Sequence, residues 1–66
     1  MTVEIKTLYL GGPFYRIAVV LDGGLLTTYR ATVGTVVQKR DRLFDYWSQN
    51  ADRVDVGEIP KATDMR

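Results

Sequence analysis

Two arginines in a β-strand pattern are the residues of this sequence best suited to bind a charged group. Arg16 and Arg30 lie in segments rich in Val, Leu, Thr and Tyr that flank the turn signal Asp22-Gly23-Gly24. Pairing the two segments across this turn places the arginines opposite each other on one face of a hairpin. Facing like charges destabilise a sheet by roughly several tenths of a kcal/mol. A phosphate or carboxylate of a partner, bound by both guanidinium groups, would offset this repulsion.

Two other arrangements of this pair are compatible with the sequence. In the first, both arginine side chains extend into water, where exposed charges interact weakly. In the second, Glu4 supplies the counter-charge from a neighbouring strand.

The sequence lacks the residues on which most catalytic and metal sites are built. It contains no His and no Cys, which removes the commonest general base, the commonest metal ligand and any thiolate zinc site. Asp41 and Asp45 are one helical turn apart, but two carboxylates without further oxygen ligands make a weak cation site. The glycine-rich turns match neither a P-loop nor a dinucleotide-binding motif. We therefore expect a non-enzymatic protein with no cofactor and no bound metal.

Glycine and proline divide the chain into segments of strand and helix length. The turn signals Gly11-Gly12-Pro13 and Asp22-Gly23-Gly24 separate three segments that suit a pleated sheet. They predict a three-stranded antiparallel meander over residues 2–10, 14–21 and 25–33. After Gly34, Thr35 and Gln38 have the spacing of a capping box, which predicts a helix over 36–50.

These elements predict a single α+β domain over residues 1–59, with the C-terminal helix packed on one face of the meander. The sequence VDVGEI at 54–59 alternates as a short fourth strand would, so the order is either βββα or βββαβ. Residues 60–66 offer little to bury and are predicted to form a flexible tail.

The apolar pattern gives the expected register of the second and third strands. A three-residue Asp22-Gly23-Gly24 loop pairs Leu21 with Leu25 and Ile17 with Tyr29. A two-residue Asp-Gly loop would instead put Tyr15 opposite Arg30 and mix polar and apolar residues on each face, so the pattern favours the longer loop. With the longer loop, one face of this hairpin is mostly apolar and carries Tyr15, Ile17, Val19, Leu21, Leu25, Thr27, Tyr29 and Ala31.

The predicted helix has an apolar stripe that should cover this face. At about 100° per residue the stripe contains Val36, Leu43, Phe44, Trp47, Ala51 and Val54. We expect Trp47 to anchor the core. Arg40 falls within the stripe, so its stem should pack at the sheet edge while its guanidinium reaches water or an acidic residue.

The opposite face of the sheet combines large apolar residues with basic ones. Leu8, Leu10, Phe14, Val20 and Leu26 share it with Lys6, Arg16 and Arg30. Single surface apolar residues are common, but five on so small a face indicate a contact surface. The candidate partner-binding residues on this face are therefore Lys6, Phe14, Arg16, Val20, Leu26 and Arg30.

One flank of the helix extends this set of candidates. Lys39, Arg42 and Tyr46 project on the same flank, together with Arg53, while Asp41, Asp45 and Asp52 project on the other. Such a separation either orients a partner electrostatically or is an ordinary solvated helix surface.

Two functions from different classes fit these residues. The first is a protein-binding module: an adaptor, a regulator or an inhibitor that occludes a larger partner, with a homodimer as a related case. The second is a nucleic-acid-binding domain that docks its sheet on DNA or RNA through Arg16, Arg30 and Lys6. The net charge of +1 and the apolar outer face favour protein binding.

The nucleic-acid alternative is supported by a resemblance of topology. Over residues 14–50, a three-stranded meander followed by one helix resembles the architecture of the arm-binding domain of some integrases. The resemblance rests on no motif, and it implies that the sheet lies in the major groove of DNA.

Length and hydropathy limit the setting of the protein. A chain of 66 residues buries only about 60% of its unfolded surface, so a partner or an oligomer would add stability. The N-terminus lacks the apolar region of a signal peptide, and no apolar run reaches the roughly 20 residues of a membrane span. We expect a cytoplasmic protein, and an origin as a phage or mobile-element accessory protein is a hypothesis consistent with its size.

Overall fold

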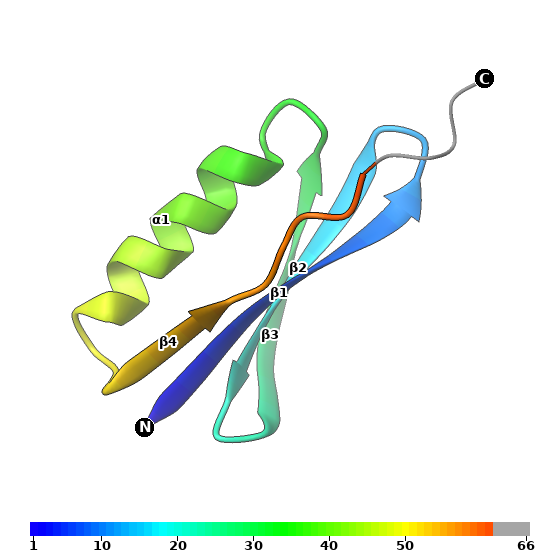
Figure 1. The fold of residues 1–66 in the computed structure, drawn as a ribbon. Helices are drawn as coiled ribbons and strands as arrows, with labels where there is room; N and C mark the ends of the chain where they lie inside the picture. Colours follow the sequence, from blue (N-terminus) through cyan, green and yellow to red (C-terminus); the bar gives the residue numbers. More distant parts are fainter. Residues whose placement is uncertain (62–66) are drawn as a thin grey trace.

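The computed structural model describes residues 1–61. In this range it contains the strands β1 (Thr2–Gly11), β2 (Phe14–Leu21), β3 (Gly24–Thr32) and β4 (Arg53–Val56), and the helix α1 (Val36–Ser48). The strands form one sheet in the order β3-β2-β1-β4, with β2 antiparallel to both neighbours and β4 parallel to β1 (Figure 1). The predicted α+β class is confirmed, and so is the βββαβ order, with the fourth strand over Arg53–Val56. The parallel β4 goes beyond the three-stranded meander on which the resemblance to integrase domains rests.

The turn between β2 and β3 differs from the prediction. Asp22 and Gly23 have positive φ values of 48° and 86°, as the two central residues of a type I′ hairpin turn do. Leu21 therefore pairs with Gly24. The predicted three-residue loop that pairs Leu21 with Leu25 is wrong.

A β-bulge next to this turn restores the expected register. Val20 pairs with Leu25 and Val19 with Thr27, so Leu26 is the extra residue of β3. A two-residue turn alone would shift the register by one residue and move the apolar residues of β3 to the opposite face of the sheet. The extra residue of the bulge shifts the register back by one residue, so the apolar residues return to the expected face. Beyond the bulge Arg16 faces Arg30, as predicted.

Helix α1 starts where predicted, but without the capping box. The Thr35 hydroxyl accepts a hydrogen bond from the Thr32 backbone N–H at 3.1 Å, and it bonds no N–H of the helix. This hydroxyl closes the turn between β3 and α1 instead of capping the helix. The helix ends at Ser48 instead of residue 50, and the Asn50 side-chain amide donates to the Tyr46 carbonyl at 2.8 Å.

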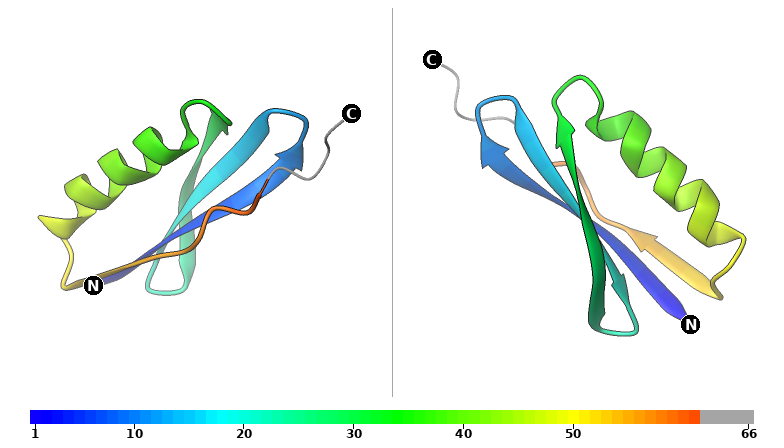
Figure 2. Two further views of the ribbon diagram at one scale, coloured as in Figure 1. Left: turned by 45° about the horizontal axis from the view of Figure 1, so that its top comes forward. Right: turned by 180° about the vertical axis from the view of Figure 1, so that it is seen from behind.

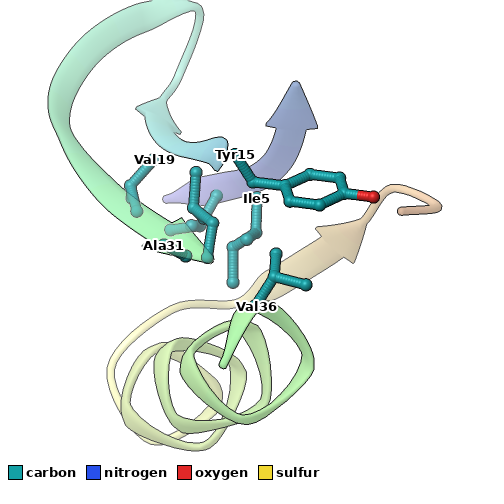
Figure 3. Close-up of a cluster of buried hydrophobic side chains, with 7 residues drawn as sticks. Ile5, Tyr15, Val19, Ala31 and Val36 are labelled. Atoms are coloured by element: carbon teal, nitrogen blue, oxygen red, sulfur yellow. The ribbon is translucent and has the colours of Figure 1, made fainter. Parts of the chain in front are cut away.

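The core fills the space between α1 and the inner face of the sheet (Figure 3). Its buried residues are Val3, Ile5, Tyr15, Ile17, Val19, Ala31 and Val36. Leu43, Trp47, Ala51 and Val54 are partly buried and pack against them, as the predicted stripe requires. Phe44 does not, because its side chain is 41% exposed. At about 100° per residue Phe44 lies at the margin of the apolar stripe, farther from its centre than Leu43 and Trp47.

The helix covers the inner face unevenly. It begins close to the end of β3, crosses the sheet obliquely and ends close to the start of β4, while the β2–β3 turn stands apart from it (Figure 1, Figure 2). The inner-face residue Tyr29 of β3 is consequently 42% exposed. Leu25, which was expected on this face, pairs with Val20 instead and is 65% exposed.

The segment after β4 covers the inner face near the β1–β2 turn, at the end opposite to the β2–β3 turn (Figure 1). The Tyr15 hydroxyl donates to the Pro60 carbonyl at 2.8 Å, and Ile59 packs against the core. Figure 3 shows the Tyr15 ring pointing toward this segment. Of the predicted tail, Pro60 is thus bonded to the core, and residues 62–66 lie outside the described part of the chain.

Candidate binding surface

The outer face of the sheet, opposite α1, brings together residues of β1, β2 and β3. The register places Lys6 beside Ala18, Leu8 beside Arg16, and Arg16 beside Arg30. Alternation along the strands puts five of the six predicted sheet candidates on this face, namely Lys6, Phe14, Arg16, Val20 and Arg30. Leu26 is at the bulge, next to them. All six are exposed except Val20, which is half-buried.

The apolar residues of this face form two groups at opposite ends of the strands. Leu8, Leu10 and Phe14 make up the first group and are 44% to 52% exposed. The second group contains Val20, Leu25 and Leu26, and it gains Leu25 only because of the bulge. Between the groups lie the paired arginines and Ala18. The surface therefore has a basic centre and two apolar ends, where the sequence suggested one apolar set.

The arginines at the centre have no acidic partner among residues 1–61. The Glu4 carboxylate, the counter-charge considered for them, lies 3.7 Å from the Lys6 ammonium instead. Arg16 and Arg30 are exposed and face each other across β2 and β3. An anion of a partner could therefore approach both guanidinium groups from solvent.

The predicted helix flank lies beside β3. Lys39, Arg42 and Tyr46 are all exposed, and the Lys39 ammonium donates to the Arg30 carbonyl at 3.0 Å. Where α1 diverges from β3, a cavity of about 190 Å³ is lined by Tyr29, Lys39, Arg42 and Leu43. Sequence reasoning missed this cavity, because the oblique crossing of the helix cannot be deduced from an apolar stripe.

The predicted charge separation on the helix holds only within α1. The helix ends before Asp52 and Arg53, which were assigned to its flanks. Arg53 belongs to β4, and its Nε lies 3.2 Å from an Asp55 carboxylate oxygen. The Asp52 carboxylate is 2.6 Å from the Met1 ammonium. Both of these pairs lie at the β1–β4 side of the sheet.

The Met1–Asp52 pair accounts for the resolved pKa shifts in the described part of the chain. The hydrogen bond from the ammonium lowers the pKa of the Asp52 carboxyl, and the same bond raises the pKa of the ammonium. This pair lies at the β1–β4 side of the sheet, away from the paired arginines of β2 and β3.

Arg40 takes the position expected for a residue within the apolar stripe. One of its terminal nitrogens lies 3.5 Å from Asp41 and the other donates to the Gly57 carbonyl at 3.5 Å. Its Nε is buried and, like the Thr7 hydroxyl, has no hydrogen-bond partner within residues 1–61. Arg40 thus fastens the segment after β4 and is not exposed to a partner as Arg42 is.

The geometry offers no metal site and no membrane span in the described residues. Residues 1–61 contain no group of three His, Cys, Asp or Glu side chains placed to hold a metal ion. No helix in this part of the chain is long and apolar enough to cross a membrane.

The chain matches no protein-family model, no curated protein and no solved structure.

Proposed function

We propose that this chain is a non-enzymatic protein-binding module, an adaptor, regulator or inhibitor that covers part of a larger partner with the outer face of its sheet. One observation carries the proposal: two groups of exposed large apolar residues flank two arginines that lack an acidic partner. Protein interfaces combine apolar contacts with arginine in this way. An exposed arginine pair alone would fit many anions, but the apolar ends fit a folded or peptide surface.

The same residues support nucleic-acid binding less well. Of the three cations assigned to that role, Lys6 is close to Glu4, which leaves Arg16 and Arg30. Leu8, Phe14 and the other apolar residues of the face have no favourable contact with a phosphate backbone, which accounts for most protein–DNA hydrogen bonds. The basic helix flank is the observation in favour of nucleic acid, and the experiments below separate the two.

Photo-crosslinking from single positions tests the proposal. A crosslinking amino acid at Phe14 should capture a polypeptide in cells of the source organism, and the adduct should survive nuclease treatment. The same amino acid at Gln38, an exposed position of α1, is the control and should capture much less. Adducts that disappear with nuclease would instead identify a nucleic-acid partner.

The double variant Arg16→Gln/Arg30→Gln tests the basic centre. We expect faster dissociation of the protein partner, with a fold that is as stable as the wild type or slightly more stable because a like-charge contact is removed. Arg53→Gln/Lys61→Gln is the control for net charge, since Arg53 lies on β4, at the far edge of the sheet, and Lys61 follows β4. Sub-micromolar binding of DNA or RNA, with a log affinity–log salt slope that falls by roughly two units in the variant, would contradict the proposal.

A further inference from the structure

The free edge of β3 presents backbone groups whose direction can be deduced from two hydrogen bonds. The Asp22 N–H donates to the Thr2 carbonyl, and the Val33 N–H donates to the Pro13 carbonyl, both at 2.8 Å. Hydrogen-bonded pairs alternate along antiparallel strands. Even-numbered residues of β2 therefore bond to β1, and its odd-numbered residues bond to odd-numbered residues of β3. It follows that Thr28, Arg30 and Thr32 direct their N–H and C=O groups away from the sheet.

Within residues 1–61, only some of these backbone groups at the β3 edge have a hydrogen-bond partner. Thr35 bonds both backbone groups of Thr32, through its hydroxyl at 3.1 Å and its N–H at 3.0 Å. Lys39 bonds the Arg30 carbonyl. The N–H and C=O of Thr28 and the N–H of Arg30 have no partner in the described residues. These three groups have the two-residue spacing of a strand ladder and form an open docking edge.

The charges around this edge are of one sign. Arg30 flanks it on the outer face, and Lys39 and Arg42 flank it on the helix side. None of the three forms an ion pair with a described residue, whereas Arg40 and Arg53 each have an aspartate within 4 Å. Pairing of β3 with β3 of a second copy would bring two such sets of cations together, which is unfavourable. An acidic segment is the complementary occupant.

The cavity beside Tyr29 adds a place for one apolar side chain. Residues of a docked strand alternate between the two faces of the extended sheet. A residue on the inner side would point toward the cavity lined by Tyr29 and Leu43, while its two neighbours would point to the outer face, near Arg30. The residues two positions away would lie on the side of Lys39 and Arg42.

We infer that the β3 edge binds an extended acidic peptide segment by strand addition, with one apolar side chain of that segment in the Tyr29–Leu43 cavity. This inference rests on the proposed function, because it names the kind of partner segment that the module recognises. Strand addition supplies main-chain hydrogen bonds, and the cavity and cations supply the preference for sequence.

A synthetic peptide tests the inference directly. The probe is a short fluorescein-labelled peptide with blocked ends and Leu at its centre. Val and Asp alternate on either side, with Asp two positions from the Leu, on the side of Lys39 and Arg42. We expect saturable binding by fluorescence anisotropy, and slower hydrogen exchange of the Thr28 and Arg30 amides by NMR when the peptide is bound. Lys39→Gln/Arg42→Gln should weaken binding roughly tenfold, whereas Arg53→Gln/Lys61→Gln should leave it within about twofold. The same peptide with Lys in place of Asp should not bind.

Thr28→Pro is the sharpest variant. The backbone N–H of Thr28, which proline lacks, faces solvent, and proline is tolerated at such positions of edge strands. The fold should therefore persist in this variant, while peptide binding is lost. If Thr28→Pro unfolds the protein, the peptide with N-methylated backbone nitrogens is used with the wild type and should not bind.

Three outcomes would overturn the inference. One is peptide binding that persists with Thr28→Pro or with the N-methylated probe. Another is the absence of binding at millimolar peptide. The last is self-association of the wild type that Thr28→Pro abolishes, which would identify a second copy as the occupant. The proposed function fails separately, when crosslinking from Phe14 captures no polypeptide.

Discussion

The two edges of the sheet differ in length, pairing and charge. At one edge, β4 has four residues, and the charged side chains near it pair within the chain, as Arg53 does with Asp55 and Met1 with Asp52. At the other edge, β3 has nine residues and is flanked by cations with no acidic partner in residues 1–61. Proteins normally protect long edges against other chains. The comparison separates charges that serve the fold from charges that are available to a partner.

The inner strand β1 contributes more to the core than the edge strand β3 does. Val3 and Ile5 of β1, the neighbour of β4, are fully buried, whereas Ala31 is the buried residue of β3. We therefore expect truncations of core side chains in β1 to cost more stability than truncations of exposed side chains in β3. The predictions below test this difference.

The largest expected effect comes from the β1 side. Ile5→Ala removes a fully buried side chain and should cost about 2–5 kcal/mol, a large part of the roughly 5–15 kcal/mol of a typical domain. Leu25→Ala, at an exposed position of β3, should change the free energy of unfolding by no more than about 0.5 kcal/mol. Urea unfolding followed by circular dichroism measures both. Equal losses in the two variants would show that β3 shares the core equally.

A smaller effect is expected where the chain closes over the core. Tyr15→Phe removes the hydrogen bond to the Pro60 carbonyl and should lower the free energy of unfolding by about 0.5–1.5 kcal/mol. Tyr46→Phe is the control, because Tyr46 is 59% exposed and its hydroxyl has no bond in the described structure. Denaturant midpoints of the two variants provide the measurement. A Tyr15→Phe variant as stable as Tyr46→Phe would mean that the segment after β4 contributes nothing.

The smallest effect concerns the ion pair near β4 and depends on pH. Because the pKa of Asp52 is lowered in the folded protein, its ion pair stabilises the fold at pH values above the ordinary carboxyl pKa. This stabilisation is lost as the pH falls through the lowered pKa. Because the pKa of the Met1 ammonium is raised in the folded protein, its ion pair stabilises the fold at pH values below the ordinary ammonium pKa. This stabilisation is lost as the pH rises through the raised pKa. Asp52→Asn should therefore lower the thermal midpoint slightly near neutral pH. The difference from the wild type should vanish in strong acid and at high pH.

Asp45→Asn serves as the control for this titration. Asp45 is exposed on α1 and has no ion pair within residues 1–61, so removing its charge should change the thermal midpoint little. A constant difference between Asp52→Asn and the wild type across the whole range would rule out the ion pair as its cause.

The strands and the helix could be predicted from the sequence because their signals are local. Glycine-rich turns, alternating apolar residues and the helical stripe predict all three strands of the meander and the start of α1 to within a residue or two. The opposition of Arg16 and Arg30 follows from the same alternation. Trp47 lies in the stripe as expected and packs against the core, although it is only partly buried.

The features that could not be predicted depend on tertiary geometry. A turn of two residues plus a bulge gives the same distant register as a turn of three, so the pattern cannot distinguish them, and Leu25 was assigned to the wrong face. The Thr35 hydroxyl had two competing acceptor roles, and the turn prevailed over the helix cap. The oblique path of α1 across the sheet (Figure 1) has no local signal in the sequence, and the cavity beside Tyr29 lies where α1 diverges from β3.

The pairing of β4 with β1 has a consequence for the order in which the chain folds. Short turns connect β1 to β2 and β2 to β3, so the contacts between these strands form at a small cost in loop-closure entropy. The pairing of Thr2 with Arg53 closes a much longer loop, which contains β2, β3 and α1. β4 is therefore expected to be the last strand to dock and the first to detach in local unfolding. When it detaches, the meander persists and the second side of β1 becomes an open edge for a limited time.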